Sequence, residues 1–432
     1  MKIRYLIAML LFLTILSAAF TPVKAVSFDS ELNAKYAVLY NLENDQILFE
    51  KEIDAAVYPA STVKIMTAVL ALEYYEGRLD TPITVKPEAI KNISGNNIAL
   101  SAGETFRAEQ LIGALIVGNA NDAAVTLAFE ISGSVEEFAD RMNQKAAEMG
   151  MTHTVFKNPT GMHHKNMVST VSDILILAKY AFNMPQFMRF SSLPKYEIGE
   201  GANRRVIHNR NYLVSSTLTS EYYYAPAKGM NAGSTYESGA CLVTAASEKN
   251  LNYICIVMGC QYDSEKNQVL SYSDAKTLLK FALENYVYTR VIDSKDIVKE
   301  LPVALGKDVD YVSAVPDKSC DVLLNKGINI SDDIQYSVTL NQEELTAPVQ
   351  AGDILGSVEA YYQGKKLASA NLIAKSSIEK SAVLTALHNL KQAVNQPIVY
   401  IISGLIVLIV LYAIAASLYR KRNKNRKSRY LK

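Results

Sequence analysis

The segment Ile398–Tyr419 contains no charged residue, and it constrains the chain more than any other feature. As a helix it would be roughly 33 Å long, enough to cross the hydrocarbon core of a membrane. The residues that follow, 420–427, are rich in Arg and Lys and include no acid. Positive charge beside a membrane helix marks the cytoplasmic side. The sequence therefore predicts a transmembrane helix at 398–419 and a basic cytoplasmic tail at 420–432; a nucleic-acid patch in the tail is the weaker alternative.

The N-terminus carries the pattern of a secretory signal. Lys2 and Arg4 precede an almost wholly apolar run, Tyr5–Phe20, and small residues follow up to Ala25. This order of charge, apolar core and cleavage site predicts a signal peptide at 1–25, cut after Ala25. The shortness of the apolar run disfavours the alternative of an uncleaved membrane helix. The two ends together predict a single-pass protein of the cell membrane whose main body is extracytoplasmic.

Charge and cysteine content narrow the classes of function. The formal net charge is +1, and much of the positive charge lies in the tail, so the sequence offers no strong attraction for nucleic acid. In an exported protein the four cysteines allow three disulfide pairings. Cys255 and Cys260 belong to an apolar stretch around 253–258, so buried, unpaired cysteines are the preferred interpretation.

The expected elements divide the exported part in two. Residues 26–290 begin with a strand hairpin at 37–49. Amphipathic helices are expected at 61–76, 108–118, 121–132, 135–149, 169–183 and 273–287. Residues 295–376 hold short, turn-separated strand-like runs and predict a mostly β domain. Apolar residues recur at helical spacing at 377–397, which predicts an amphipathic linker helix that rests on the membrane surface.

Ser61 and Lys64 form the most specific chemical pattern in the chain. Residues at i and i+3 lie on one face of a helix, so a neutral Lys64 is placed to take the proton of the Ser61 hydroxyl. The same Ser-x-x-Lys spacing recurs at Ser192, Ser273 and Ser377. Of these serines, only Ser61 follows a Pro-Ala turn and opens a long apolar helix, so its context singles it out.

The segment Tyr58–Ala68 resembles the nucleophile segment of the low-molecular-mass penicillin-binding proteins, the serine D-alanyl-D-alanine carboxypeptidases. Further segments agree over about residues 30–375, namely 116–127, Asn158-Pro159-Thr160-Gly161, Ser172-Asp173-Ile174, Asn209-Arg210-Asn211, 233–242 and 347–352. The resemblance implies an α/β (α+β) transpeptidase fold, as in penicillin-binding proteins and serine β-lactamases, followed by a small β domain. It also implies that Ser61 attacks the D-Ala–D-Ala bond of a peptidoglycan stem peptide and that β-lactams acylate the same serine.

Two of the family's three motifs are altered in this chain. The family's Ser-x-Asn is replaced by Asn119-Ala120-Asn121, and its Lys-Thr-Gly by Asn231-Ala232-Gly233. The Asn119 amide holds a hydrogen bond but does not readily relay a proton, at a cost of ~10²–10⁴-fold in rate. Asn231 and Ala232 lack the charge and hydroxyl that bind the substrate's terminal carboxylate, which would cost about ten- to a hundredfold each.

Other groups of the expected site match the family. Asn121 and Gly233 are retained for contacts with the substrate backbone, and the N–H groups of Ser61 and Ser234 match its oxyanion hole. A cation near Lys64 would help to keep its amine neutral; without one, Lys64 is expected to hold its proton more tightly and to be a poorer base at neutral pH. The expected catalytic residues are Ser61, Lys64 and Asn119; the expected substrate-binding residues are Asn121, Asn231, Gly233 and Ser234.

The sequence leaves three functions open. The first is a wall-trimming serine carboxypeptidase that needs no metal or organic cofactor. The second is a wall- or partner-binding module with little or no peptidase activity, which the altered motifs favour and the intact Ser61–Lys64 pair opposes. The third is a serine hydrolase whose substrate lacks a free carboxylate. Lys228, Arg204 and Arg205 are alternatives for the missing cation, but they are interpreted as solvated surface charges.

Overall fold

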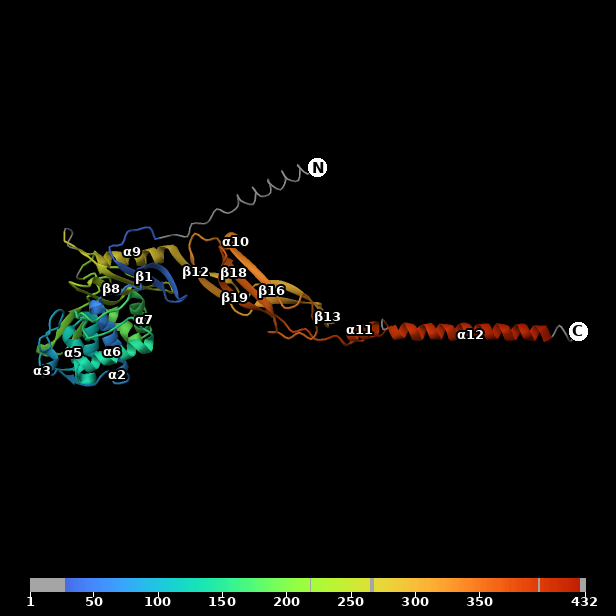
Figure 1. The fold of residues 1–432 in the computed structure, drawn as a ribbon, viewed down its shortest axis with the longest axis horizontal. Coiled ribbons are helices and arrows are strands. Elements are labelled where there is room, and N and C mark those ends of the chain that lie inside the picture. Colours follow the sequence, from blue (N-terminus) through green and yellow to red (C-terminus); the bar gives the residue numbers. More distant parts are fainter. Residues whose placement is uncertain (1–27, 218, 265–267, 395–396, 428–432) are drawn as a thin grey trace, which may run out of the picture. The chain divides into compact units, whose positions relative to one another are not determined.

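The computed structural model describes residues 28–217, 219–264, 268–394 and 397–427, so the expected signal peptide at 1–25 lies outside the described residues (Figure 1). Contacts between residues divide the chain into two units. Within the described residues, the first unit runs to Tyr288 and also includes 323–328. The second comprises 289–322 and the residues from Asn329 onward, and it holds the β-rich region and the C-terminal helices.

An antiparallel five-stranded sheet forms the centre of the first unit, with strand order β2-β1-β9-β8-β7. Its strands are β1 Tyr36–Asn41, β2 Gln46–Lys51, β7 Ala227–Thr235, β8 Gly239–Glu248 and β9 Leu251–Cys260. Nearly every side chain of the central strand β9 is buried, because apolar clusters cover both faces of the sheet. Cys255 and Cys260 are buried and unpaired in this strand, as expected, and Cys241 and Cys320 are also unpaired in the structure.

Helices cover both faces of this sheet (Figure 1). One face packs Val38 and Ile256 against apolar residues of α2, α4, α5, α6 and α7, whereas the other packs Leu39 and Cys255 against α9. Successive residues of a strand point to opposite faces, so neighbouring residues enter different cores. The helices are α2 Lys64–Tyr74, α3 Pro87–Ile90, α4 Ala108–Gly118, α5 Asn121–Ser132, α6 Val135–Met149, α7 Val171–Phe182, α8 Pro185–Ser191 and α9 Leu270–Asn285.

The other elements of the first unit are short. They are the 3-10 turns η1 Ala60–Val63 and η2 Gly201–Asn203, and the strands β3 Pro82–Thr84, β4 Thr105–Arg107, β5 Lys195–Ile198, β6 Arg205–His208, β10 Tyr262–Asp263 and β11 Gln268–Val269. These strands pair as β3 with β4, β5 with β6 and β10 with β11.

The helix predictions were most accurate where strong end signals flank an apolar pattern. The ranges 108–118, 121–132 and 135–149 match α4, α5 and α6 at both ends. Gly133 ends α5 in the left-handed conformation, and the Ser134 side chain accepts a hydrogen bond from the Glu137 N–H at the start of α6. The start predicted at Ser61 was wrong: α2 begins at Lys64, because the chain first makes the tighter η1 turn.

The second unit is mostly β-structure, as predicted. Its six-stranded sheet has the order β16-β18-β19-β14-β13-β17. The elements that follow α9 in the chain are β12 Tyr286–Ile292, β13 Lys299–Ala304, β14 Tyr311–Pro316, β15 Cys320–Asn325, α10 Ile330–Asp333, β16 Ile334–Leu340, β17 Leu345–Thr346, β18 Ile354–Tyr362 and β19 Lys365–Ala374. The helix expected at 273–287 is α9, which ends at Asn285 because Tyr286 starts β12.

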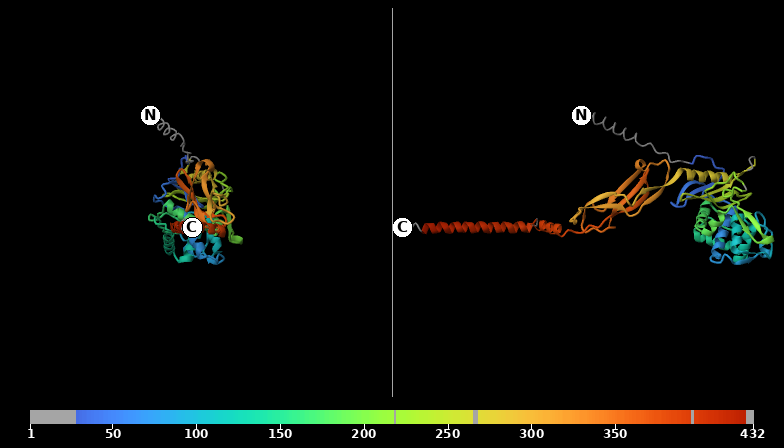
Figure 2. Two further views of the ribbon diagram at one scale, coloured as in Figure 1. Left: turned by 90° about the vertical axis from the view of Figure 1, so that its right-hand side faces the viewer. Right: turned by 180° about the vertical axis from the view of Figure 1, so that it is seen from behind.

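Two helices follow the β-rich region, α11 Ala382–Val394 and α12 Pro397–Lys427. The linker helix expected at 377–397 is shorter than predicted, because Ile378 still pairs with Val349 in a β-bridge. Within the described ranges, α12 is the one helix long and apolar enough to cross a membrane, over Tyr400–Arg422. Figure 2 shows it as one continuous helix, and it extends through basic residues that were expected to form the tail.

Candidate active site

The turn before α2 holds Ser61 in place. The Thr62 hydroxyl donates a hydrogen bond to the Pro59 carbonyl oxygen at 2.6 Å, within the η1 turn. Gly161 packs directly against this turn, and a side chain there would stand 1.9 Å from the Ala60 carbonyl oxygen. Gly161 also has a φ of +77°. Glycine is therefore required at 161 both by its conformation and by the close approach of its loop to the Ser61 turn.

Lys64 lies beside Ser61 and is buried, with 1% of its surface exposed. The Lys64 Nζ lies 2.9 Å from the Ser61 Oγ. Burial lowers the pKa of Lys64 from 10.5 to about 7, because the protein interior solvates the ammonium poorly. A large neutral fraction is then present at neutral pH. Burial accounts for this lowered pKa, so Lys64 can serve as a base without a neighbouring cation.

A carbonyl group from the loop 158–161 orients the Lys64 amine. Lys64 Nζ donates a hydrogen bond to the Thr160 carbonyl oxygen at 2.6 Å. The loop itself is braced by Asn158, whose Oδ1 accepts hydrogen bonds from the Thr160 hydroxyl at 2.9 Å and from its N–H at 3.2 Å. With one N–H engaged by this carbonyl, the lone pair of the neutral amine is available to the Ser61 hydroxyl.

The second altered motif lies between α4 and α5. Asn119 ends α4 in the left-handed conformation, with φ 53° and ψ 37°. Its Nδ2 donates a hydrogen bond to the Ala232 carbonyl oxygen of β7 at 2.8 Å, so the amide links the helical layer to the sheet. Asn121 Nδ2 donates to the Ser94 carbonyl oxygen at 2.6 Å. The Oδ1 atoms of Asn119 and Asn121 are buried and have no hydrogen-bond partner in the described part of the chain.

The third altered motif lies on the edge strand β7. A side chain at Gly233 would stand 2.4 Å from the Ser61 Cβ, so the strand approaches the serine too closely for any residue larger than glycine. Asn231 is buried, and its Oδ1 has no hydrogen-bond partner within the described ranges. The two altered motifs thus hold three buried amide oxygens that have no hydrogen-bond partner among the described residues.

These segments meet at a cleft of about 300 Å³. The cleft is lined by five of the seven predicted site residues: Ser61, Asn119, Asn121, Gly233 and Ser234. Of the other two, Lys64 lies behind Ser61, and Asn231 is buried beside the cleft without lining it.

The prediction missed Arg210, which lines the same cleft. The Arg210 side chain is exposed, and its backbone is fixed at both ends: its N–H donates to the Val117 carbonyl oxygen at 3.0 Å, and its carbonyl oxygen accepts from the Tyr272 hydroxyl at 2.6 Å. It makes no ion pair with any described residue. The Asn209-Arg210-Asn211 segment was already part of the family resemblance, and that signal marks Arg210 as a site residue.

The other cations that were considered do not line this cleft. Arg204 pairs with Glu197 at 2.6 Å, and Arg205 pairs with Glu104 at 2.8 Å. Lys228 is likewise absent from the lining residues. The interpretation as solvated surface charges holds for Arg204, which is exposed, whereas Arg205 and Lys228 are partly buried. Over the described ranges, no group of three or more His, Cys, Asp or Glu side chains is arranged to hold a metal ion.

Comparison with known proteins shows the family of this chain. Residues 22–262 match the D-alanyl-D-alanine carboxypeptidase (peptidase S11) family, and residues 286–380 match the C-terminal domain of penicillin-binding protein 5. The D-alanyl-D-alanine carboxypeptidase DacF of Bacillus subtilis is 28% identical over 357 residues, covering 82% of this chain and 88% of the relative. DacC of Escherichia coli, also a D-alanyl-D-alanine carboxypeptidase, is 26% identical over 373 residues, covering 84% and 88%.

The solved structures agree. Penicillin-binding protein 5 from Haemophilus influenzae superposes with a TM-score of 0.61 at 25% identity, covering 82% of this chain and all of that one. The predicted penicillin-binding-protein fold, with its β-rich C-terminal domain, is confirmed. Since the first family match covers more than half of its length, the chain belongs to the D-alanyl-D-alanine carboxypeptidase family of low-molecular-mass penicillin-binding proteins.

Proposed function

We propose that this chain is a membrane-anchored serine carboxypeptidase that removes the terminal D-Ala from peptidoglycan stem peptides through an acyl-Ser61 intermediate. The observation that carries the proposal is the pair formed by Ser61 Oγ and Lys64 Nζ, 2.9 Å apart, with the pKa of the buried lysine lowered to about 7. A nucleophile with an adjacent neutral base is the arrangement that acyl transfer requires.

In this mechanism the Ser61 hydroxyl attacks the carbonyl carbon of the D-Ala–D-Ala bond while its proton passes to neutral Lys64. The N–H groups of Ser61 and Ser234 stabilise the developing oxyanion. Collapse of the tetrahedral intermediate breaks the peptide bond, and the departing D-Ala nitrogen takes up a proton. Water then attacks the acyl ester, giving the shortened peptide and free Ser61. A β-lactam would acylate the same Ser61 oxygen through opening of its ring.

Recognition of the substrate's terminal carboxylate is assigned to Arg210 in this proposal. Asn231 and Ala232 carry no charge, whereas Arg210 is an exposed cation in the lining of the Ser61 cleft. A guanidinium binds a carboxylate with two parallel hydrogen bonds, so it replaces a lysine effectively when its position allows. Asn119 and Asn121 offer their amide oxygens to N–H groups of the bound peptide.

The C-terminal helix is consistent with an enzyme that acts on the cell wall. The apolar helix α12 fits a single-pass membrane anchor. We infer that the basic residues after Tyr419 lie on the cytoplasmic side, so the Ser61 cleft faces the wall. Stem peptides are part of an insoluble polymer, and a tethered enzyme remains close to them.

A second candidate function is a wall- or partner-binding module with little turnover. The observation that favours it is the Asn119 amide, which is bonded to the Ala232 carbonyl oxygen where the family has a serine hydroxyl. An amide in this place holds the cleft together but does not pass a proton to the leaving group. A hydrolase acting on a substrate without a free carboxylate is the third candidate, and the uncharged Asn231-Ala232 pair favours it.

One experiment separates these candidates. The full chain in detergent is incubated with a penicillin, its intact mass is measured, and D-Ala release from a D-Ala–D-Ala peptide is assayed in parallel, with Ser61→Ala as the control. A Ser61-dependent adduct together with D-Ala release supports the carboxypeptidase. An adduct without release supports the binding module, and release from a blocked-carboxylate ester supports the third candidate. Absence of any adduct at raised pH contradicts the proposal.

A further inference from the structure

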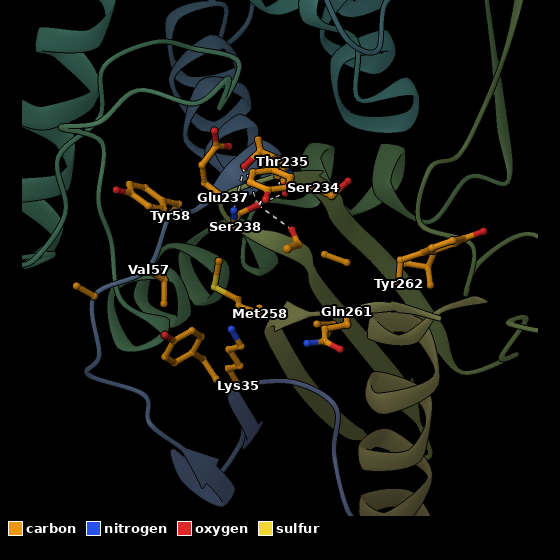
Figure 3. A pocket seen from close by; sticks show the side chains of 18 residues that line it. Lys35, Val57, Tyr58, Ser234, Thr235, Glu237, Ser238, Met258, Gln261 and Tyr262 are labelled. Atoms are coloured by element: carbon orange, nitrogen blue, oxygen red, sulfur yellow. Dashed lines mark hydrogen bonds between the residues drawn. The ribbon is translucent and has the colours of Figure 1, made fainter. Parts of the chain in front are cut away.

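A second, larger cavity lies beside the Ser61 cleft in the first unit. It measures about 920 Å³ (Figure 3). Four segments far apart in the sequence line it together with Val269: 35–36, 56–58, the turn from Ser234 to Ala240, and 258–262. We call it the Lys35 pocket. It shares Ser234, Ala240 and Val269 with the Ser61 cleft, so the two spaces adjoin at the end of β7.

A substrate peptide that lies along β7 would reach from the Ser61 cleft into the Lys35 pocket. Among the described strands, β7 is the last strand of its sheet and pairs only with β8, so a substrate peptide can add along its free edge. Under the proposed function, the terminal carboxylate lies toward Ala232 and Arg210, and the scissile carbonyl lies at Ser234. The acyl-donor part of the peptide then continues past Thr235, which leads into the Lys35 pocket.

Lys35 is the one cation among the residues that line this pocket, and its side chain is exposed. It forms no ion pair with a described residue. The one acidic lining residue, Glu237, already faces His163, with 3.6 Å between the carboxylate oxygen and the imidazole Nδ1. Figure 3 shows Lys35 on the side of the pocket opposite the Ser234–Ser238 turn, near Met258. The pocket therefore offers a lysine that makes no ion pair with a described residue, together with the Glu237 carboxylate, among apolar and amide groups.

The walls of the pocket are braced. Thr235 N–H donates to the Ser238 hydroxyl oxygen at 2.9 Å, and Ser238 N–H donates to the Thr235 hydroxyl oxygen at 3.1 Å, so the turn is closed twice. The Lys35 N–H donates to the Met258 carbonyl oxygen at 3.1 Å. A side chain at Gly259 would stand 3.1 Å from the Lys35 Cβ, so the base of the lysine lies tight against β9. The cation is thus presented from a fixed backbone.

We propose that the Lys35 pocket is a subsite for the acyl-donor part of the substrate, upstream of the scissile bond, and that Lys35 binds a carboxylate carried there. The inference rests on the proposed function for its direction along β7. It makes Lys35 a specificity-determining residue: peptides with a free carboxylate upstream of D-Ala–D-Ala are preferred over their amidated counterparts.

The test compares two pentapeptides, L-Ala-γ-D-Glu-L-Lys-D-Ala-D-Ala with a free D-Glu carboxylate and the same peptide with a carboxamide in its place. Binding of both is measured by calorimetry to the full chain in detergent, in a Ser61→Ala background that prevents turnover. We expect the acid to bind about three- to tenfold more tightly, as befits one exposed charged contact. Lys35→Gln should bring this ratio close to one, and Lys35→Arg should preserve it.

Lys91→Gln is the matched control, because Lys91 is an exposed lysine of the same unit that lines neither cavity, and it should leave the ratio unchanged. Equal affinities for the two peptides, a ratio that survives Lys35→Gln, or no binding of either peptide would overturn the inference. D-Ala release by the chain with Ser61 intact is scored separately. If D-Ala is released but the acid and the amide peptide bind equally well, the subsite is rejected and the proposed function is kept. If the acid peptide binds more tightly but no D-Ala is released, the subsite is kept and the proposed function is rejected.

Discussion

The two sides of the Ser61 cleft differ in how completely their polar groups are satisfied. On the α2 side, Lys64 Nζ contacts both Ser61 Oγ and the Thr160 carbonyl oxygen. On the side formed by Asn119, Asn121 and β7, three buried amide oxygens have no partner within the described ranges. Under the proposed function, the first side supplies the nucleophile and the base, and the second side binds the substrate.

This difference has a physical origin. The pair Ser61–Lys64 needs only neighbouring residues and burial, because burial alone lowers the pKa of Lys64 to about 7. Recognition of a carboxylate depends on side chains from segments far apart in the sequence. A substitution can remove one of these side chains without changing the others. The comparison therefore predicts that acylation of Ser61 is retained more fully than turnover of a peptide.

The largest effect is expected from Lys64→Met, which removes the base and fills a similar volume. The acylation rate with a penicillin should fall by ~10²–10⁴-fold. Stopped-flow acylation by a fluorescent penicillin measures it. Lys145→Met is the control, because Lys145 also lies on a helix and pairs with Glu73 at 2.6 Å, away from the residues that line the cleft. A variant that acylates at the parent rate would show that the α2 side does not supply the base.

Gly233→Ala tests whether acylation requires the close approach of β7 to Ser61. The new Cβ would stand 2.4 Å from the Ser61 Cβ, so the serine or the strand must move. A displacement of about 1 Å costs on the order of 10²-fold in rate. Acylation rates and circular dichroism are compared with those of Gly327→Ala, where the nearest atom would be 3.4 Å away. Full activity in Gly233→Ala would refute the close approach.

Restoring the family residues at 231 and 232 should improve substrate recognition on the β7 side of the cleft. The double variant Asn231→Lys, Ala232→Thr should raise D-Ala release by about ten- to a hundredfold, because it returns a charge and a hydroxyl to the recognition side. Release is assayed with a D-Ala–D-Ala peptide, and the same double variant carrying Ser61→Ala must show none. If release does not rise, Arg210 already supplies the carboxylate contact or the limitation lies at Asn119, and Asn119→Ser distinguishes these two outcomes.

The smallest expected effect is the pH dependence of acylation. Lys64 acts as a base only when neutral, and burial lowers its pKa to about 7. The acylation rate should therefore rise with pH, by about tenfold per unit well below pH 7, and level off above about pH 8. The profile is measured between pH 5.5 and about 9 with a penicillin that is stable over this range. A rate that still rises by about tenfold per unit at pH 9, without levelling off, would mean that Lys64 is not desolvated as the structure indicates.

Sequence patterns were sufficient for the features that depend on local signals. The bounds of α4, α5 and α6 follow from apolar periodicity with glycine, serine and asparagine at the ends, and the Ser61–Lys64 pair follows from its spacing and its Pro-Ala context. The prediction of a helix that could cross a membrane required only an uncharged run of sufficient length. The family motifs also located Asn119 and Gly233, which line the cleft, although their chemical roles stay predictions.

The tertiary structure decided what depends on segments that are distant in the chain. Burial of Lys64 by surrounding helices and strands lowers its pKa to about 7, which the sequence did not predict, because desolvation is a property of the packed core. The Asn119 amide is hydrogen-bonded to Ala232 of β7, 113 residues further along the chain. Arg210 reaches the cleft from a loop, and nothing in the sequence of that loop indicates which residues it lies beside. The Lys35 pocket likewise joins residues from both ends of the first unit. Local sequence determines which residues can do chemistry, whereas folding determines their solvation and their neighbours, and these set the pKa values and the charge that a substrate meets.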